Sequence, residues 1–225
     1  MVDIALLLNK FTAPSMSIPT QMVKGASTTH VFNNIQGRQI LLNDGYKKEA
    51  HLFNIFTDQL DCGVQWVDKG LKSCCHLYDP DSKSGMWLWP NAAEKCSELF
   101  NKAVSLWKKK NHPKSMFYLG AALHLVQDLC VPHHAVCNVL YGHQEFEDWS
   151  ELRKYNYTVE DGGIYDISGK PEDWVAENAR QAKKYFPLVK GRSTENNHYT
   201  VAKLLPLAQR TSAGFLKFFY NHVFK

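Results

Sequence analysis

The sequence predicts an all-α protein, and three observations support that fold class. Apolar residues recur at helical spacing through most of the chain after His30, strand-like alternation is scarce, and no internal repeat or low-complexity segment is present. With 225 residues, of which 44% are hydrophobic and 21% charged, the chain resembles an ordinary globular protein. A chain of this length can bury a large core. We therefore expect a multi-helix bundle with long loops.

Two parts are expected along the chain. Residues 1–29 lack helical periodicity and carry Pro14, Pro19 and Gly25, so they are predicted to form a poorly defined arm. Residues 30–225 are predicted to form one domain. Its first helix begins at His30, shows one face at the positions Phe32, Ile35, Gln39 and Leu42, and ends at Asp44-Gly45.

Two further helices are expected in the first half of this domain. One has the apolar positions Ala50, Phe53, Phe56 and Leu60 and is expected to end near Cys62-Gly63. Residues 69–90 follow as a loop because they are rich in glycine, proline and serine. The next helix is strongly amphipathic, with apolar residues spaced i, i+3, i+4, i+7 and i+11 at Cys96, Leu99, Phe100, Ala103 and Trp107.

The segment from Lys114 to Cys130 is apolar on nearly every face, which predicts a central, buried helix. Pro132 is expected to end it, and a new helix is expected near His143. Residues 156–170 are predicted to form a loop or short hairpin. A helix should follow from Pro171, and a last, aromatic-rich helix should span Val201–Phe224.

Charge and targeting signals narrow the function classes. The net charge of +4 is too small to indicate nucleic-acid binding, and no apolar run is long enough for a transmembrane helix. The N-terminus shows no clear signal peptide, because the apolar run Ile4–Leu8 is short and a basic segment is missing. The six cysteines include no CxxC pair, so we expect reduced, partly buried thiols.

The histidines carry the strongest chemical signal. His124 and Asp128 lie four residues apart on the helix that is predicted to be buried, so they project from one face. A buried carboxylate and imidazole without partners would cost several kcal/mol. Either a metal ion or a hydrogen-bonded His–Asp pair in the core would remove that cost.

The next twenty residues favour the metal. His134 follows the helix, and His143 and Glu147 form a second pair four residues apart. Two such pairs from neighbouring helices, with His134 between them, make a compact set of nitrogen and oxygen donors that suits zinc better than calcium or magnesium. His133 breaks this spacing, so it is expected to be exposed or to support a ligand.

These residues resemble the zinc-dependent phospholipase C family of bacteria. The resemblance rests on Tyr118-Leu-Gly, the spacing H-x3-D-x5-H from His124 to His134, and H-x3-E from His143. Earlier segments agree: Thr29-His30-Val-Phe-x-Asn, Trp66-Val-Asp68, and His76-Leu-Tyr-Asp-Pro-Asp. The resemblance implies an all-α bundle that cleaves phospholipids to diacylglycerol and a phosphorylated headgroup by metal-activated water.

The same resemblance implies a site for two to three zinc ions. The first ion would be bound by Asp68, His76, His124 and Asp128, and Asp68 would also serve as the catalytic base. The second would be bound by His134, His143 and Glu147. A third would be bound by His30 together with Asp128, which would bridge two ions. The family also uses an N-terminal tryptophan, whereas no tryptophan precedes Trp66 here.

Other expectations follow from the resemblance. The substrate would be a phospholipid, the membrane surface would be contacted transiently, and no nucleic acid would be bound. The location would be secreted or cell-surface, with a cytoplasmic location left open, as is the oligomeric state. Two alternative functions are a single-strand nuclease or nucleotidase of the related zinc family and an inactive zinc-binding homologue. Glu147 argues against the nuclease, which tends to have aspartate there, and the full ligand set argues against the inactive protein.

Overall fold

The computed structural model describes residues 28–69, 74–86, 89–138 and 140–224. Within these ranges the regular structure is helical, apart from one isolated antiparallel bridge between Asp79 and Ser84. The all-α prediction is therefore confirmed. The predicted arm over residues 1–29 lies outside the described residues except for its last two positions.

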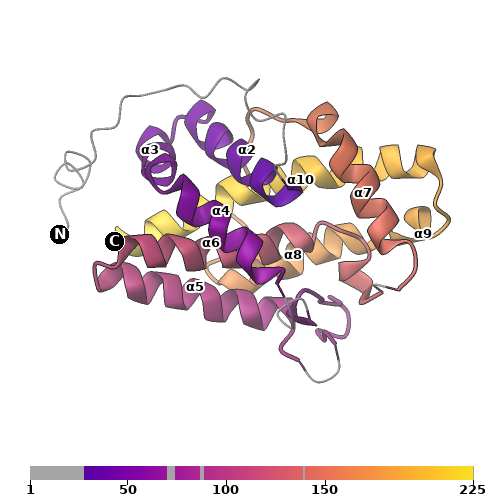
Figure 1. Cartoon of the computed structure of the whole chain (residues 1–225), viewed down its shortest axis with the longest axis horizontal. Coiled ribbons are helices and arrows are strands. Elements are labelled where there is room, and N and C mark those ends of the chain that lie inside the picture. The colour runs from indigo at the N-terminus through magenta and orange to yellow at the C-terminus, as the bar shows by residue number, and fades with distance from the viewer. Residues whose placement is uncertain (1–27, 70–73, 87–88, 139, 225) are drawn as a thin grey trace.

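The helices follow one another with loops of very different length (Figure 1). In chain order they are α2 (Thr29–Asn43), α3 (Lys47–Ile55), α4 (Thr57–Val67), α5 (Ala92–Lys108), α6 (His112–Asp128), the 3-10 turn η3 (His134–Val136), α7 (His143–Arg153), η4 (Lys154–Tyr157), α8 (Pro171–Lys183), α9 (Phe186–Val189) and α10 (Thr194–Val223).

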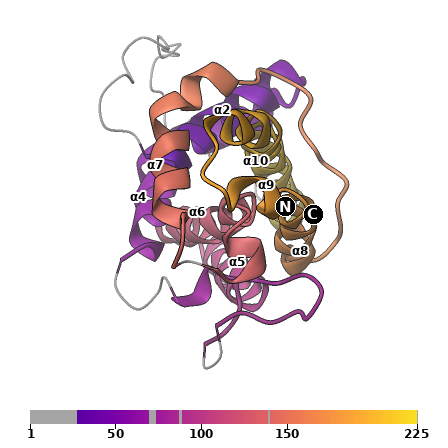
Figure 2. The same cartoon turned by 90° about the vertical axis from the view of Figure 1, so that its right-hand side faces the viewer.

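Helix α6 lies at the centre of the bundle. It packs most extensively against α4 and α5, and also against α8 and α10. Helix α10 runs along much of the molecule and packs against α2, and the end-on view of Figure 2 shows α2, α10 and α6 one beneath another. From Leu119 to Asp128 every residue of α6 is buried, which confirms the predicted central helix.

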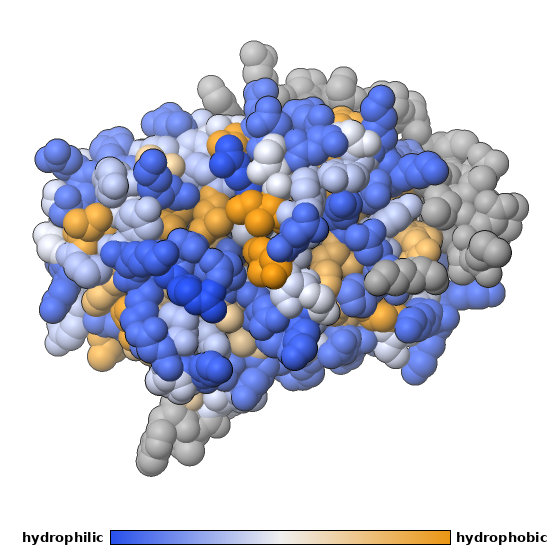
Figure 3. All heavy atoms as spheres, turned by 180° about the vertical axis from the view of Figure 1, so that it is seen from behind, coloured by the Kyte–Doolittle hydropathy of each residue, from blue (hydrophilic) through white to orange (hydrophobic). Residues whose placement is uncertain are grey.

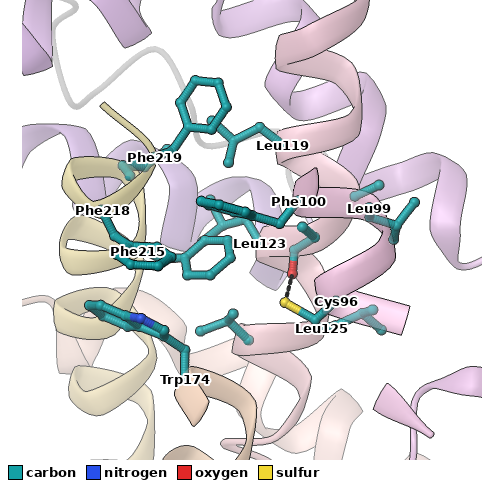
Figure 4. Close-up of a cluster of buried hydrophobic side chains, with 14 of the residues drawn as sticks. Cys96, Leu99, Phe100, Leu119, Leu123, Leu125, Trp174, Phe215, Phe218 and Phe219 are labelled. Carbon is teal, nitrogen blue, oxygen red and sulfur yellow. Dashed lines mark hydrogen bonds between the residues drawn. The ribbon is translucent and has the colours of Figure 1, made fainter. Parts of the chain in front are cut away.

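The main apolar core fills the space between α5, α6, α8 and α10 (Figure 4). Phe100 lies at its centre, with ring centroids 5.0 Å from Phe218 and 5.3 Å from Phe215. Trp174 of α8 is fully buried against the same two phenylalanines. Such aromatic packing favours folding through the large apolar area that it removes from water.

Two glycines allow α4 and α6 to approach each other closely. A Cβ atom at Gly63 would lie 2.1 Å from the carbonyl oxygen of Phe117, and one at Gly120 would lie 2.2 Å from that of Leu60. These distances are far below a van der Waals contact, so only glycine fits at either position. The contact brings the C-terminal ends of the two helices together.

The structure corrects three predicted boundaries. The predicted single helix over Ala50–Leu60 is two helices separated at Phe56, and Gly63 lies inside α4 rather than after its end. Gly63 does not end the helix because its small size is used for packing. Helix α10 begins at Thr194 instead of Val201, where the Ser193 hydroxyl caps it, and it continues through Pro206.

The long loops appear where they were predicted. Residues 158–170 form a loop without a hairpin, and residues 74–86 hold only a short turn and the single bridge. All six cysteines are free thiols. The face shown in Figure 3 is mostly hydrophilic, with a small group of hydrophobic residues near its middle. No described helix is both long enough and apolar enough to cross a membrane.

Candidate metal centre

Asp128, the last residue of α6, is surrounded by four histidine rings. Its Oδ2 atom lies 2.8 Å from His76 Nδ1, 3.0 Å from His124 Nε2 and 3.5 Å from His134 Nδ1. Its Oδ1 atom lies 3.3 Å from His30 Nε2. The two oxygens of one carboxylate thus face different histidines, which is the arrangement expected of a bridging ligand.

Asp68 completes the first group of donors. It follows the last residue of α4, and its Oδ1 atom lies 3.1 Å from His124 Nε2 and 3.7 Å from His76 Nδ1. Asp68 is half exposed, with a side chain 51% accessible, whereas Asp128 is only 3% accessible. Asp68 is therefore open to solvent and Asp128 is closed in by protein.

A second group of donors lies beside the first. His134 Nε2 and His143 Nε2 are 2.6 Å apart, and Glu147 Oε1 lies 2.9 Å from the His143 nitrogen and 3.3 Å from the His134 nitrogen. His143 and Glu147 are on one face of α7, as their spacing predicts.

All eight expected ligands therefore come together, although their grouping differs from the expected one, and His30 is grouped with Asp68 and His124 instead of Asp128. Three sets of donor atoms are close enough to hold an ion: His30–Asp68–His124, His76–His124–Asp128, and His134–His143–Glu147. Asp68 thus joins His30 in one set, whereas the resemblance placed it with His76 and Asp128. The assignment of ligands to individual ions stays a prediction.

Local structure explains how these side chains are aimed. Helix α6 ends at Asp128, and the turn that follows places His134 in η3 beneath Asp128. The loop carrying His76 is tied to this turn, because Tyr78 N donates to the His134 carbonyl at 3.2 Å. His76 Nε2 lies 3.3 Å from the Val67 carbonyl, so it carries the proton and leaves Nδ1 facing Asp128.

The carboxylates of the cluster create a negative electrostatic potential at its histidines. Burial alone would lower the pKa of His124, but Asp128 and Asp68 outweigh burial and raise it to about 10. His134 behaves alike: burial opposes its charge, and Asp128 and Glu147 raise its pKa to about 10. Burial disfavours the Asp128 carboxylate, yet the surrounding histidines hold its pKa well below the usual range. The same field favours any cation placed among these residues.

The residues fit zinc on two observations. His124 Nε2, Asp128 Oδ2 and His134 Nδ1 are buried and have no hydrogen-bond partner in the described part of the chain, although they lie close to opposite charges. In addition, two histidine nitrogens 2.6 Å apart can share only one proton, so a set of two imidazoles and a carboxylate suits Zn²⁺.

Sequence reasoning missed two features of the site. His133 is fully buried against Phe146 and Phe186, and burial together with His143 and His134 lowers its pKa to about 4, so it stays neutral. The cluster also opens into a cavity of about 490 Å³, one wall of which is apolar: Val131, Phe146, Val201, Leu204, Leu205 and Ala208. The last helix was predicted from its aromatic residues, but its role in lining a cavity was not.

An all-helical bundle with a histidine–carboxylate cluster beside a cavity is the arrangement expected of a helical metalloprotein. The comparisons with known proteins narrow that class. The model of the family described as "Zinc dependent phospholipase C" matches residues 28–216, and the chain belongs to this family.

Relatives agree in sequence and in fold. A phospholipase C of Bacillus cereus is 29% identical over 172 residues, covering 65% of this chain and 61% of the relative. One of Listeria monocytogenes is 26% identical, covering 84% of this chain and 76% of the relative. The alpha toxin of Clostridium absonum superposes with a TM-score of 0.77 at 21% identity, covering 88% of this chain and 64% of the toxin. The chain thus spans about three fifths of the length of the Bacillus relative.

Proposed function

We propose that residues 30–225 form a single catalytic domain that hydrolyses phospholipids, releasing diacylglycerol and a phosphorylated headgroup. The observation that carries this proposal is the meeting of the donor cluster with an apolar cavity wall. A phospholipid has the same division, with an anionic phosphate next to hydrocarbon. Membership of the family supports the same reaction.

The cofactor would be two to three zinc ions. His134, His143 and Glu147 would bind one ion, and the remaining five ligands would bind the others around Asp128. Zinc in such a site lowers the pKa of bound water and neutralises charge on phosphoryl oxygens.

The protein residues would divide the remaining tasks. Asp68 would be the catalytic base as well as a ligand: burial disfavours its charge, but contact with His124 lowers its pKa, so it is ionised at neutral pH. Its exposure at the cavity lets it accept a proton from water. Asp128, closed in by four histidines, would hold the ions together. The apolar wall of α10 would bind hydrocarbon and exclude water from the phosphate.

The membrane surface would be contacted transiently, near the site. Leu140 and Tyr141 lie between His134 and His143 in the chain and are 85% and 76% exposed, and Met86, 39% exposed, also lines the cavity. Exposed apolar side chains this close in the chain to the donor cluster suit an interface with lipid. We propose a secreted or cell-surface location, where such lipid is the substrate.

The test is an assay of the zinc-loaded protein on phosphatidylcholine vesicles, with diacylglycerol measured, beside an assay on single-stranded DNA. We expect lipid cleavage, loss of that cleavage in Asp68→Asn, and no cleavage of DNA. Cleavage of DNA without cleavage of lipid would establish the nuclease instead. Zinc binding without either activity would establish the inactive homologue. Leu140→Ser should reduce vesicle cleavage but leave cleavage of a short-chain soluble lecithin unchanged.

A further inference from the structure

A chain of hydrogen-bonded polar side chains runs from His30 in the donor cluster along α2 to Asp61 on α4. His30 Nδ1 lies 2.9 Å from Gln127 Oε1, and Gln127 Nε2 lies 3.0 Å from Asn34 Oδ1. Asn34 Nδ2 in turn lies 2.9 Å from Asp61 Oδ1 on α4. Gln127 and Asn34 are 2% and 0% exposed, so their amides have no water with which to exchange partners.

The Asp61 end of this chain fixes the direction of every hydrogen bond in it. Burial raises the pKa of Asp61, but the Arg38 guanidinium, 3.8 Å from its carboxylate, and the Asn34 amide oppose this and favour the ionised form, which can only accept. Asn34 must therefore turn its NH₂ group toward Asp61 and its oxygen toward Gln127. Gln127 must then turn its own NH₂ group toward Asn34, which leaves its oxygen facing His30.

A second and independent anchor gives the same direction. The Ser212 hydroxyl donates its one proton to the Ala208 carbonyl at 2.6 Å, so it can only accept from Gln127 Nε2, which lies 3.1 Å away. Two acceptors on different helices, Asp61 on α4 and Ser212 on α10, thus demand the same orientation of one amide.

The orientation of the Gln127 amide determines the tautomer of His30. Because Gln127 presents an oxygen, His30 Nδ1 must carry a proton, and the lone pair of the neutral ring is on Nε2, which faces Asp128 at 3.3 Å. We propose that Gln127, oriented by Asp61 and Ser212, is a positioning residue that holds His30 in the one tautomer that can bind zinc through Nε2. This inference rests on the proposed function, because it requires zinc at His30.

The hydrogen bonds along α2 also fix the position of the His30 ring. His30, Asn34 and Arg38 are four residues apart and share one face of α2. Arg38 Nε donates to Asn54 Oδ1 at 3.1 Å, and the His30 ring stacks on His124 with centroids 3.8 Å apart. His30 is 21% exposed at its side chain and lies in the first turn of α2, so this support replaces the rigidity that deep burial gives His124.

The test compares Gln127→Met with Gln209→Met in the zinc-loaded protein. Gln209 is a matched control: it is fully buried, and it bonds the backbone of Val159 and Tyr157 away from the metal centre. We expect Gln127→Met to release one zinc ion to a competing chelator with affinity lowered about 10-fold or more. Gln209→Met should leave zinc affinity unchanged even where it lowers thermal stability.

The nitrogen NMR spectrum of the His30 ring reports which nitrogen carries the proton. A purely structural role of Gln127 would not change that spectrum. In the zinc-loaded parent protein we expect a proton on Nδ1 and none on Nε2. The double variant Asp61→Asn/Ser212→Ala keeps Gln127 but removes both anchors, so it should weaken the same zinc ion and lose the slowly exchanging Nδ1 proton. A proton on Nε2 in the parent, or unchanged zinc affinity in Gln127→Met, would overturn the inference alone. Absence of any zinc binding would overturn it together with the proposed function.

Discussion

The buried segment of α6 has two halves, Leu119–Leu123 and His124–Asp128, which are buried to the same extent but are stabilised in opposite ways. Leu119 and Leu123 in the first half are inaccessible and belong to the main apolar core. His124 and Asp128 in the second half are as deeply buried, yet their polar atoms lack hydrogen-bond partners in the described part of the chain. Burial favours folding in the first half, and in the second half it costs free energy that a bound cation offsets.

The largest effect should come from Asp128→Asn, which removes the carboxylate charge from the second half. Removing this charge takes away the one carboxylate that contacts four histidines. We expect lipid hydrolysis to fall by more than about 100-fold, because loss of even an outer support of a metal ligand commonly costs 10- to 100-fold. Elemental analysis should show a loss of more than one zinc ion per chain. A full zinc content in this variant would show that Asp128 does not bridge.

Phe100→Ala on α5 should weaken the apolar core that contains the first half without touching the second. Phe100 is 1% exposed and packs against three phenylalanines of α10, so the variant leaves a large cavity. The free energy of unfolding should fall by about 3–5 kcal/mol in urea titrations of the zinc-loaded protein. Zinc content per folded chain should stay that of the parent. Loss of zinc from the folded variant would show that the two halves are coupled.

His30→Ala should have a smaller effect on the metal centre than Asp128→Asn. His30 belongs to one donor set, whereas the other two sets do not include it. We expect the remaining zinc ions to stay bound and hydrolysis to fall by roughly 10-fold. Equilibrium dialysis of the two variants side by side measures the difference. Equal zinc loss in both would mean that the ions are mapped wrongly onto these residues.

Asp44→Asn should have the smallest effect. It tests a carboxylate that hydrogen bonds stabilise, in contrast to the carboxylates of the donor cluster. Burial disfavours the charge of Asp44, but hydrogen bonds from Tyr165 and from the backbone of Gly163 and Gly162 outweigh burial and lower its pKa. These donors, together with the charge of Arg210, stabilise the carboxylate and fasten the loop of residues 158–170 to the end of α2.

The pH dependence follows from the lowered pKa of Asp44. Its contribution to stability is present above its unfolded value near 3.8 and is lost as the pH falls through the lower folded value. At pH 7 the variant should be less stable by about 1 kcal/mol, since the site is partly exposed to solvent. The difference between variant and parent should shrink in unfolding experiments below pH 4. A constant difference would mean that the charge of Asp44 is not involved.

The sequence predicted the helices and the histidine cluster because both have a local signature. Helical spacing marked α5 and α6, and the pairs His124–Asp128 and His143–Glu147 are themselves helical spacings. The division between α3 and α4 at Phe56 was missed, because apolar periodicity continues across it. The hydrogen bonds of Gln127 were missed for a different reason. Its partners Asn34 and Ser212 are 93 and 85 residues away, and nothing local links them.

The glycine contact between α4 and α6 has a consequence for coordination chemistry. Gly63 precedes Asp68 by five residues and Gly120 precedes His124 by four, so each ligand lies little more than one helical turn from the contact. Backbone atoms meet at the contact, and the spacing cannot shrink or relax as side chains repack. If Asp68 and His124 bind zinc as proposed, the two helices would act as one chelating agent whose donor spacing is set before an ion binds, and little conformational entropy would be lost on binding.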